Sequence, residues 1–212
     1  MCIRTMEEIT YNKSRVVNFS DAVFSIVITL LILEVAVPTG RELGSTAFSE
    51  VLSNRIPAFI GLLVSFLVSA LYWLGHLRLM KFVTEFDNKL FWLNIFFLLS
   101  MVLLPFSTAM YVNGFGLAGP FIFYCLNLTL IGVLNLLMMG YVYRIDKDNV
   151  FPELEFKWFR ARGVNVVAIW IIAAICALIF PWISRFIFLM LFVNQIFIDR
   201  YYKKRMRVIA QC

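Results

Sequence analysis

Two carboxylates lie within the first long apolar stretch of the chain, residues 15–37: Asp21 near one end and Glu34 near the other. An ionised side chain inside a membrane-spanning helix costs about 3 kcal/mol or more, so it is retained where other groups compensate for it. With about 100° of rotation per residue, Asp21 lies about 140° from Ile26 around the helix, and Ser20 about 120°. We therefore expect Ser20 and Asp21 to meet polar partners on other helices.

The opposite side of the same stretch is apolar. Ile26, Leu30 and Leu33 fall within about 60° of one another, as expected for one face of a helix. We call these three residues the apolar stripe. The face also includes Phe19, Ala22, Val23 and Val37. Thr29 lies about 60° to the side, where its hydroxyl either offers an oxygen or frees a backbone carbonyl between the apolar residues.

The composition excludes an ordinary soluble domain. The 212 residues are 62% hydrophobic with a mean hydropathy of +0.86, whereas soluble domains average near half apolar. The chain has one histidine and four widely separated cysteines, so no metal site or disulfide framework is predicted. The sequence lacks nucleotide-binding and nucleophile motifs. We expect an all-α polytopic membrane protein that is not an enzyme and uses no cofactor.

Hydropathy and turn residues predict six membrane-spanning helices in a single domain over residues 1–212. Asn113, Gly114, Gly116 and Pro120 divide one long uncharged run into two spans. The expected spans are 15–37, 55–76, 90–111, 118–143, 163–180 and 183–202, with a short surface helix near 43–52 between the first two.

Charge sets the expected orientation. If the N-terminus is cytoplasmic, 16 of the 19 Lys and Arg residues fall on inner segments, as the positive-inside rule requires. We expect both termini in the cytoplasm, a multi-pass protein of the cell membrane, and no nucleic-acid partner despite the net charge of +6.

Residues 112–116, Val-Asn-Gly-Phe-Gly, superficially resemble the carbonyl filter of ordinary potassium channels. Such a filter follows a re-entrant helix, whereas this peptide joins two long apolar runs directly. We interpret it as a turn, so no re-entrant pore loop is expected. His76, at the inner end of the second span, is interpreted as a hydrogen-bonded structural histidine rather than a proton relay.

The first span also carries Arg15-x-x-x-Phe19-Ser20-Asp21, which resembles the signature of the transmembrane protein 175 family. This family comprises potassium channels of endosomes and lysosomes together with prokaryotic relatives. Further similarities are Trp73-x-x-His76 in the second span, and Leu93-Asn94 and 104–108 in the third. One departure is Ala22, where the family often has glycine.

The resemblance implies a homotetramer of six-helix units around a pore lined by the first helices. It implies a filter of apolar side chains that fall on Ile26, Leu30 and Leu33, with potassium ions as the permeant species. The signature residues Arg15, Phe19, Ser20 and Asp21 would pack against the second and third spans, with His76 and Asn94 as partners.

Two other functions stay open from the residues alone. Asp21, Glu34 and His76 supply the titratable groups of a proton-coupled secondary transporter. A membrane scaffold without transport is the third possibility. The sequence favours the potassium-permeable channel, because Asp21 points away from the apolar stripe and no internal repeat typical of transporters is evident.

Overall fold

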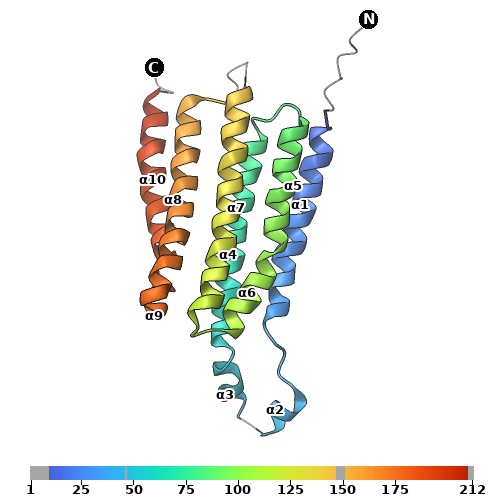
Figure 1. The fold of residues 1–212 in the computed structure, drawn as a ribbon, viewed down its shortest axis with the longest axis vertical. Coiled ribbons are helices and arrows are strands. Elements are labelled where there is room, and N and C mark those ends of the chain that lie inside the picture. Colours follow the sequence, from blue (N-terminus) through green and yellow to red (C-terminus); the bar gives the residue numbers. More distant parts are fainter. Residues whose placement is uncertain (1–9, 46, 147–150, 210–212) are drawn as a thin grey trace, which may run out of the picture.

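The computed structural model describes residues 10–45, 47–146 and 151–209, and these fold into a bundle of helices (Figure 1). Within these described residues, six helical segments are long and apolar enough to cross a membrane, which confirms the predicted number of spans. The elements are α1 (Lys13–Leu30), the 3₁₀ turn η1 (Leu31–Glu34), α2 (Gly40–Ser45), α3 (Phe48–Ser53), α4 (Ile56–Met80), α5 (Asn88–Val102), α6 (Leu104–Asn113), α7 (Ala118–Ile145), α8 (Glu153–Ile179), α9 (Pro181–Ser184) and α10 (Phe188–Ile209).

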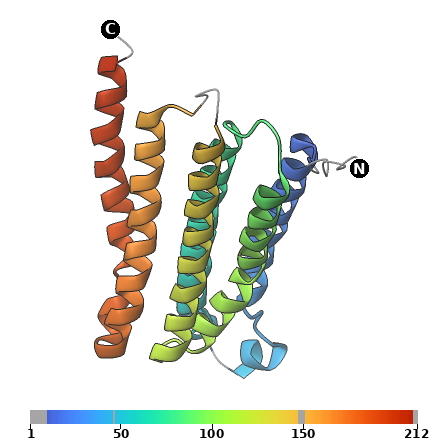
Figure 2. The same cartoon turned by 45° about the horizontal axis from the view of Figure 1, so that its top comes forward.

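The helices are arranged around α7. It packs against α8, α5 and α6, while α10 packs on α8 and α1 packs on α4 and α5, as the two views of the ribbon show (Figures 1 and 2). Helix α1 begins and α10 ends at the same end of the bundle, which we call the terminal end (Figure 1). The short helices α2 and α3 extend beyond the opposite end, which we call the hairpin end.

The first span is shorter as an α-helix than expected. Helix α1 ends at Leu30, and Leu31–Glu34 form a 3₁₀ turn before the chain becomes extended at Val35. A 3₁₀ turn is common at a helix C-terminus, and Pro38 disfavours helical continuation of the residue before it. The prediction of one helix over 15–37 was therefore wrong at its C-terminal end.

Three other helical segments differ from the expected ones. Helix α8 begins at Glu153 rather than 163, because charged residues end an apolar window without ending a helix. The third span is two helices, α5 and α6, that meet immediately before Pro105, whose ring is incompatible with a regular helix interior. The segment expected as one surface helix forms α2 and α3 instead.

The 112–116 peptide is a turn, as predicted. Helix α6 ends at Asn113 and α7 begins at Ala118. Gly116 has a φ of 137°, a conformation that residues with a side chain rarely adopt.

A polar clasp joins the hairpin-end segment to α4. Arg55 pairs with the Glu42 carboxylate at 3.1 Å and donates from Nε to the Ala36 carbonyl at 2.8 Å. Glu42 also accepts a hydrogen bond from the Thr39 backbone N–H at 2.8 Å. The hydrogen bonds from Thr39, followed by the one from Arg55, hold the pKa of Glu42 below its usual value. The clasp therefore fixes the chain between the first two spans.

Candidate functional site

Helix α1 has an inner and an outer side. Asn12 caps its start by accepting a hydrogen bond from the Arg15 backbone N–H at 3.3 Å. Four residues at helical spacing are buried against the rest of the bundle: Val16, Ser20, Phe24 and Val27. Because α1 contacts both α4 and α5, this inner side is fixed to the second and third spans.

A chain of hydrogen bonds connects the inner side of α1 to those spans. The Asn94 amide of α5 donates to Ser20 Oγ at 3.0 Å, and its carbonyl oxygen lies 2.9 Å from His76 Nε2 of α4. All three residues are at most 1% exposed. We call Ser20, Asn94 and His76 the polar chain. Satisfied buried polar groups of this kind favour one arrangement of the helices, because any other arrangement leaves them unpaired.

Asp21 has a different partner from the one expected. Its Oδ1 accepts a hydrogen bond from the Trp73 indole at 2.9 Å. Trp73, named above for the resemblance in the second span, thus bonds directly to α1. Asp21 therefore has a polar partner on another helix, α4, but it forms no direct hydrogen bond with His76 or Asn94 among the described residues.

His76 is enclosed by aromatic rings. Its imidazole stacks on Phe97 with a centroid distance of 5.5 Å and an interplanar angle of 2°, and Phe24 of α1 lies 5.7 Å away. Together with the bond to Asn94, this makes His76 a hydrogen-bonded histidine in the core.

The outer side of α1 carries the apolar stripe. The exposed fractions of Ile26, Leu30 and Leu33 are 58%, 41% and 71%, whereas Leu31 is fully buried. Leu33 lies on the 3₁₀ turn rather than on the α-helix, yet it remains on the uncovered side. Within the described chain, no other element covers the three side chains.

A second row of exposed residues runs beside the stripe: Asn18, Ala22, Ser25 and Thr29. The Thr29 hydroxyl lies within hydrogen-bond distance of two backbone carbonyls, those of Ser25 at 3.0 Å and Ile26 at 2.9 Å. The Thr29 hydroxyl proton is therefore donated to a backbone carbonyl of the same helix, while the hydroxyl oxygen stays exposed with its lone pairs free. Thr29 was predicted from the sequence, whereas the row to which it belongs was not, although its spacing of three and four residues is that of one helix face.

Two signature residues are not packed as expected. Phe19 is 55% exposed and Arg15 is exposed, so neither packs inside the second and third spans. The reason is positional, because Phe19 precedes Ile26 by seven residues and Arg15 precedes Phe19 by four, which places both on the outer side. Glu34 is half-buried on η1, at the other end of α1 from Asp21.

Comparison with known proteins shows which family this arrangement resembles. A sequence model of the family described as "Endosomal/lysosomal potassium channel TMEM175" matches residues 15–105, a range that holds the apolar stripe, the polar chain and Trp73. A potassium channel of Streptomyces collinus is 38% identical over 96 residues. Residues 15–105 of this chain are therefore similar to the TMEM175 family.

The TMEM175 relatives match this chain over part of their length. The match to the S. collinus channel covers 45% of this chain and 46% of the relative. A potassium channel of Chamaesiphon minutus is 33% identical over 96 residues, which is 45% of this chain and 47% of the relative. The matched region thus spans about half the length of these two relatives. The human relative, named an endosomal/lysosomal proton channel, is 28% identical over 69% of this chain and 29% of its own length.

The fold agrees with that of a solved structure over nearly the whole chain. A crystal structure of a lysosomal potassium-selective channel TMEM175 homologue from C. minutus superposes with a TM-score of 0.75 at 23% identity. The superposition covers 90% of this chain and 97% of the other. The six-helix architecture is therefore that of TMEM175 structures.

Proposed function

We propose that this protein is a potassium-permeable channel, a homotetramer whose pore is lined by α1. The observation that carries the proposal is the two-sidedness of α1. Hydrogen bonds fix Ser20 and Asp21 to α5 and α4, and Ile26, Leu30 and Leu33 are left uncovered. Exposed apolar residues alone are ordinary in a membrane, but here they lie on the helix that carries the family signature.

In this proposal the apolar stripe forms the constriction. Four copies of Ile26, Leu30 and Leu33 around an axis make successive apolar rings, which gate by dewetting and admit an ion only when it sheds water. Such rings offer no oxygen ligands in exchange. K⁺ is the larger and more weakly hydrated ion, so it loses less hydration free energy than Na⁺ when it sheds water. Discrimination between the two ions is therefore real but modest.

The row of small residues beside the stripe supports close packing of neighbouring first helices. Small side chains let helix backbones approach closely in membranes. Ala22, Ser25 and Thr29 provide such a surface next to the stripe, and Asn18 continues the row. Ala22 in place of the family's frequent glycine keeps this surface small, and the exposed oxygen of Thr29 lies closest to the proposed constriction.

The polar chain and the Asp21–Trp73 bond have a structural role in this proposal. They set the rotation of α1 about its axis. A rotation of about 100°, which is one residue of a helix, would turn the apolar stripe away from the proposed axis and bring the neighbouring residues of the sequence there instead. Phe19 and Arg15, which are exposed in the protomer, would be covered by the neighbouring subunit.

We also propose the topology that the charge pattern predicts. Residues 1–212 act as one channel domain in the cell membrane, with both termini cytoplasmic and without a re-entrant pore loop. The terminal end of the bundle then faces the cytoplasm, and α2 and α3 face the outside.

A proton-coupled transporter that uses Asp21, Glu34 and His76 is the alternative, and the name of the vertebrate relatives as proton channels gives it weight. The geometry supports it less well than the channel. Asp21 accepts from Trp73 and His76 bonds to Asn94, while Glu34 lies on η1 beyond the end of α1. The three groups therefore do not form one relay.

Liposome flux tests the proposed function. Purified protein reconstituted into potassium-loaded liposomes should release K⁺ down its gradient, both with and without an opposing Na⁺ gradient and without any pH gradient. Uptake that requires a proton gradient would contradict the channel and favour the transporter. Absence of flux under every gradient would favour the scaffold.

A further inference from the structure

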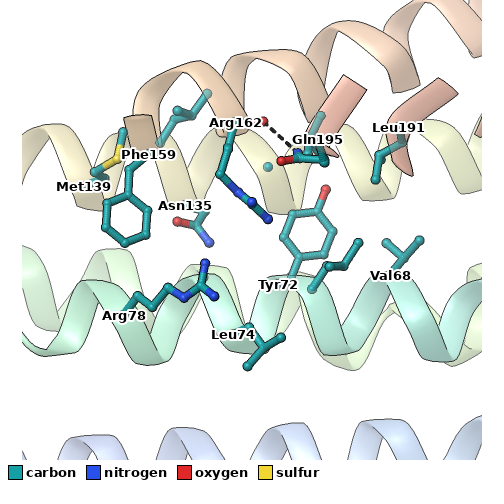
Figure 3. A pocket seen from close by; sticks show the side chains of 16 residues that line it. Val68, Tyr72, Leu74, Arg78, Asn135, Met139, Phe159, Arg162, Leu191 and Gln195 are labelled. Carbon is teal, nitrogen blue, oxygen red and sulfur yellow. Dashed lines mark hydrogen bonds between the residues drawn. The ribbon is translucent and has the colours of Figure 1, made fainter. Parts of the chain in front are cut away.

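A cavity of about 100 Å³ lies on the side of α4 that faces away from α1. It is bounded by α4, α7, α8 and α10 (Figure 3). Helix α4 contacts α7 only sparsely and packs mainly on α1 and α6, so the cavity occupies the space between α4 and the last two spans. It is separate from the outer side of α1.

Polar groups from four helices converge on this cavity. Arg78 enters from α4 and Arg162 from α8, and Asn135 of α7 lies between them (Figure 3). The Gln195 amide of α10 donates to the Arg162 carbonyl at 3.3 Å, and its own oxygen has no partner among the described residues although Gln195 is only 8% exposed. The cavity therefore offers several donors and one buried acceptor.

The cavity has an excess of positive charge. Arg162 pairs with Asp199 through Nη1, and the Trp158 indole donates to the same carboxylate oxygen at 2.9 Å. Arg78 forms no ion pair in the described part of the chain, and its guanidinium lies 5.3 Å from the centre of the Trp158 ring. Asp199 thus neutralises one of the two guanidinium groups and leaves the other available.

The remaining walls are apolar, and they include Val68, Leu71 and Leu191. Leu74, also in the lining, is 41% exposed, so the cavity opens to the surface of the bundle. Arg78 lies in the last turn of α4, at the terminal end. A ligand that fits this cavity has an anionic group at that end and an apolar part along the helices.

We propose that this cavity binds the phosphate of an anionic phospholipid from the leaflet at the terminal end. The Arg78 guanidinium and the Asn135 amide hold the phosphate oxygens, and Arg162 adds the N–H groups that do not bond to Asp199, a geometry for which arginine is suited. Basic pockets between spans are a known mode of anionic lipid recognition. A volume of about 100 Å³ accommodates the phosphate and not the whole lipid, so the acyl chains extend past Leu74 onto the apolar surface.

A lipid titration tests this site without any transport measurement. The delipidated protein in detergent is titrated with phosphatidylglycerol, phosphatidylcholine or inorganic phosphate, while thermal unfolding and bound lipid by native mass spectrometry are recorded. We expect phosphatidylglycerol to raise the unfolding temperature and to remain bound. The other two probes should have little effect, because each lacks either the net charge or the acyl chains.

Matched variants separate a built site from general charge attraction. Arg78→Gln should raise the phosphatidylglycerol concentration for half-saturation about tenfold, since one hydrogen-bonded charge is lost. Arg144→Gln removes an exposed cation in the last turn of α7 and should leave that concentration unchanged. Asn135→Ala keeps both arginines and should weaken binding by a smaller factor, which provides a test if Arg78→Gln does not fold.

Three results would overturn the proposal. Equal stabilisation by phosphatidylglycerol and phosphatidylcholine would mean that the charge is irrelevant. Equal stabilisation by inorganic phosphate would assign the cavity to a free anion. An Arg144→Gln variant that weakens binding as much as Arg78→Gln would mean that attraction is spread over the whole terminal end.

Discussion

The Trp73 indole of α4 donates a hydrogen bond to the Asp21 carboxylate of α1 at 2.9 Å. The bond joins the second span to the helix whose other side carries the apolar stripe. An N–H that bonds to a carboxylate is among the stronger hydrogen bonds in proteins. The rotation of α1, and with it the direction in which Ile26, Leu30 and Leu33 point, depends on this contact and on the polar chain.

Replacing Asp21 should therefore affect stability before ion preference. Asp21→Ala leaves the Trp73 N–H unpaired and should cost about 1–3 kcal/mol, seen as a lower unfolding temperature and less assembled protein in size-exclusion chromatography. Asp21→Asn keeps the shape and one acceptor, so it should assemble and keep the wild-type ion preference. An assembled Asn variant that has lost pH-driven K⁺ uptake would instead favour the transporter.

Two glycines of α7 provide a matched test of the packing. A Cβ on Gly132 would lie 2.8 Å from Val167 Cγ2 and 3.3 Å from the Tyr72 hydroxyl, whereas one on Gly140 would meet nothing within 4 Å. Gly132→Ala should destabilise the bundle by about 1–3 kcal/mol through overpacking. Gly140→Ala should be neutral or stabilise by up to about 1 kcal/mol through helix propensity. The measurement is the unfolding temperature of each variant in the same detergent. The same shift for both variants would contradict this packing of α4, α7 and α8.

The clasp between Glu42 and Arg55 should loosen in acid. Hydrogen bonds lower the folded pKa of Glu42 below 4.5, so its stabilising contribution is present above that pH and is lost as the pH falls through the folded pKa. Hydrogen exchange in residues 39–55 should accelerate between neutral pH and about pH 3, after correction for the intrinsic pH dependence. Glu42→Gln should already exchange fast at neutral pH, whereas Glu50→Gln, with no ion pair among the described residues, should behave as the wild type.

Cysteine labelling tests the proposed orientation. Cys2 and Cys212 lie outside the described residues, so both are replaced by serine in the background protein. Ser45→Cys at the hairpin end should react with an impermeant maleimide in intact cells. Lys204→Cys at the terminal end should react only after the membrane is opened. The reverse pattern would invert the topology.

The number of spans and the rotation of α1 could be predicted from the sequence, because both depend on local periodicity. Helical angles separated Leu30 from Leu31, and Leu30 is exposed while Leu31 is fully buried. The same angles directed Ser20 and Asp21 toward other helices, where their partners are found.

Features that depend on contacts between distant segments were not predictable in this way. Apolar spacing does not reveal that Trp73, rather than His76, bonds to Asp21. Arg185 is 6% exposed, with its guanidinium 4.5 Å from the Phe115 ring centre and 4.8 Å from that of Trp182, contacts that no local sequence pattern indicates. Helix α8 extends into a charged segment that hydropathy excluded, because hydrogen bonding and not hydropathy decides where a helix begins.

The most direct test of the account is the ion preference of Leu30→Ala beside that of Leu130→Ala. The two leucines are similarly exposed, at 41% on α1 and 46% on α7, so both substitutions remove the same side chain from a surface position. Reversal potentials are measured under opposed K⁺ and Na⁺ gradients in planar bilayers. If the apolar stripe forms the constriction, Leu30→Ala widens it and shifts the reversal potential toward equal permeability, while Leu130→Ala keeps the wild-type value. Equal shifts for both variants, or an unchanged potential for Leu30→Ala with its current intact, would contradict a pore lined by this face of α1.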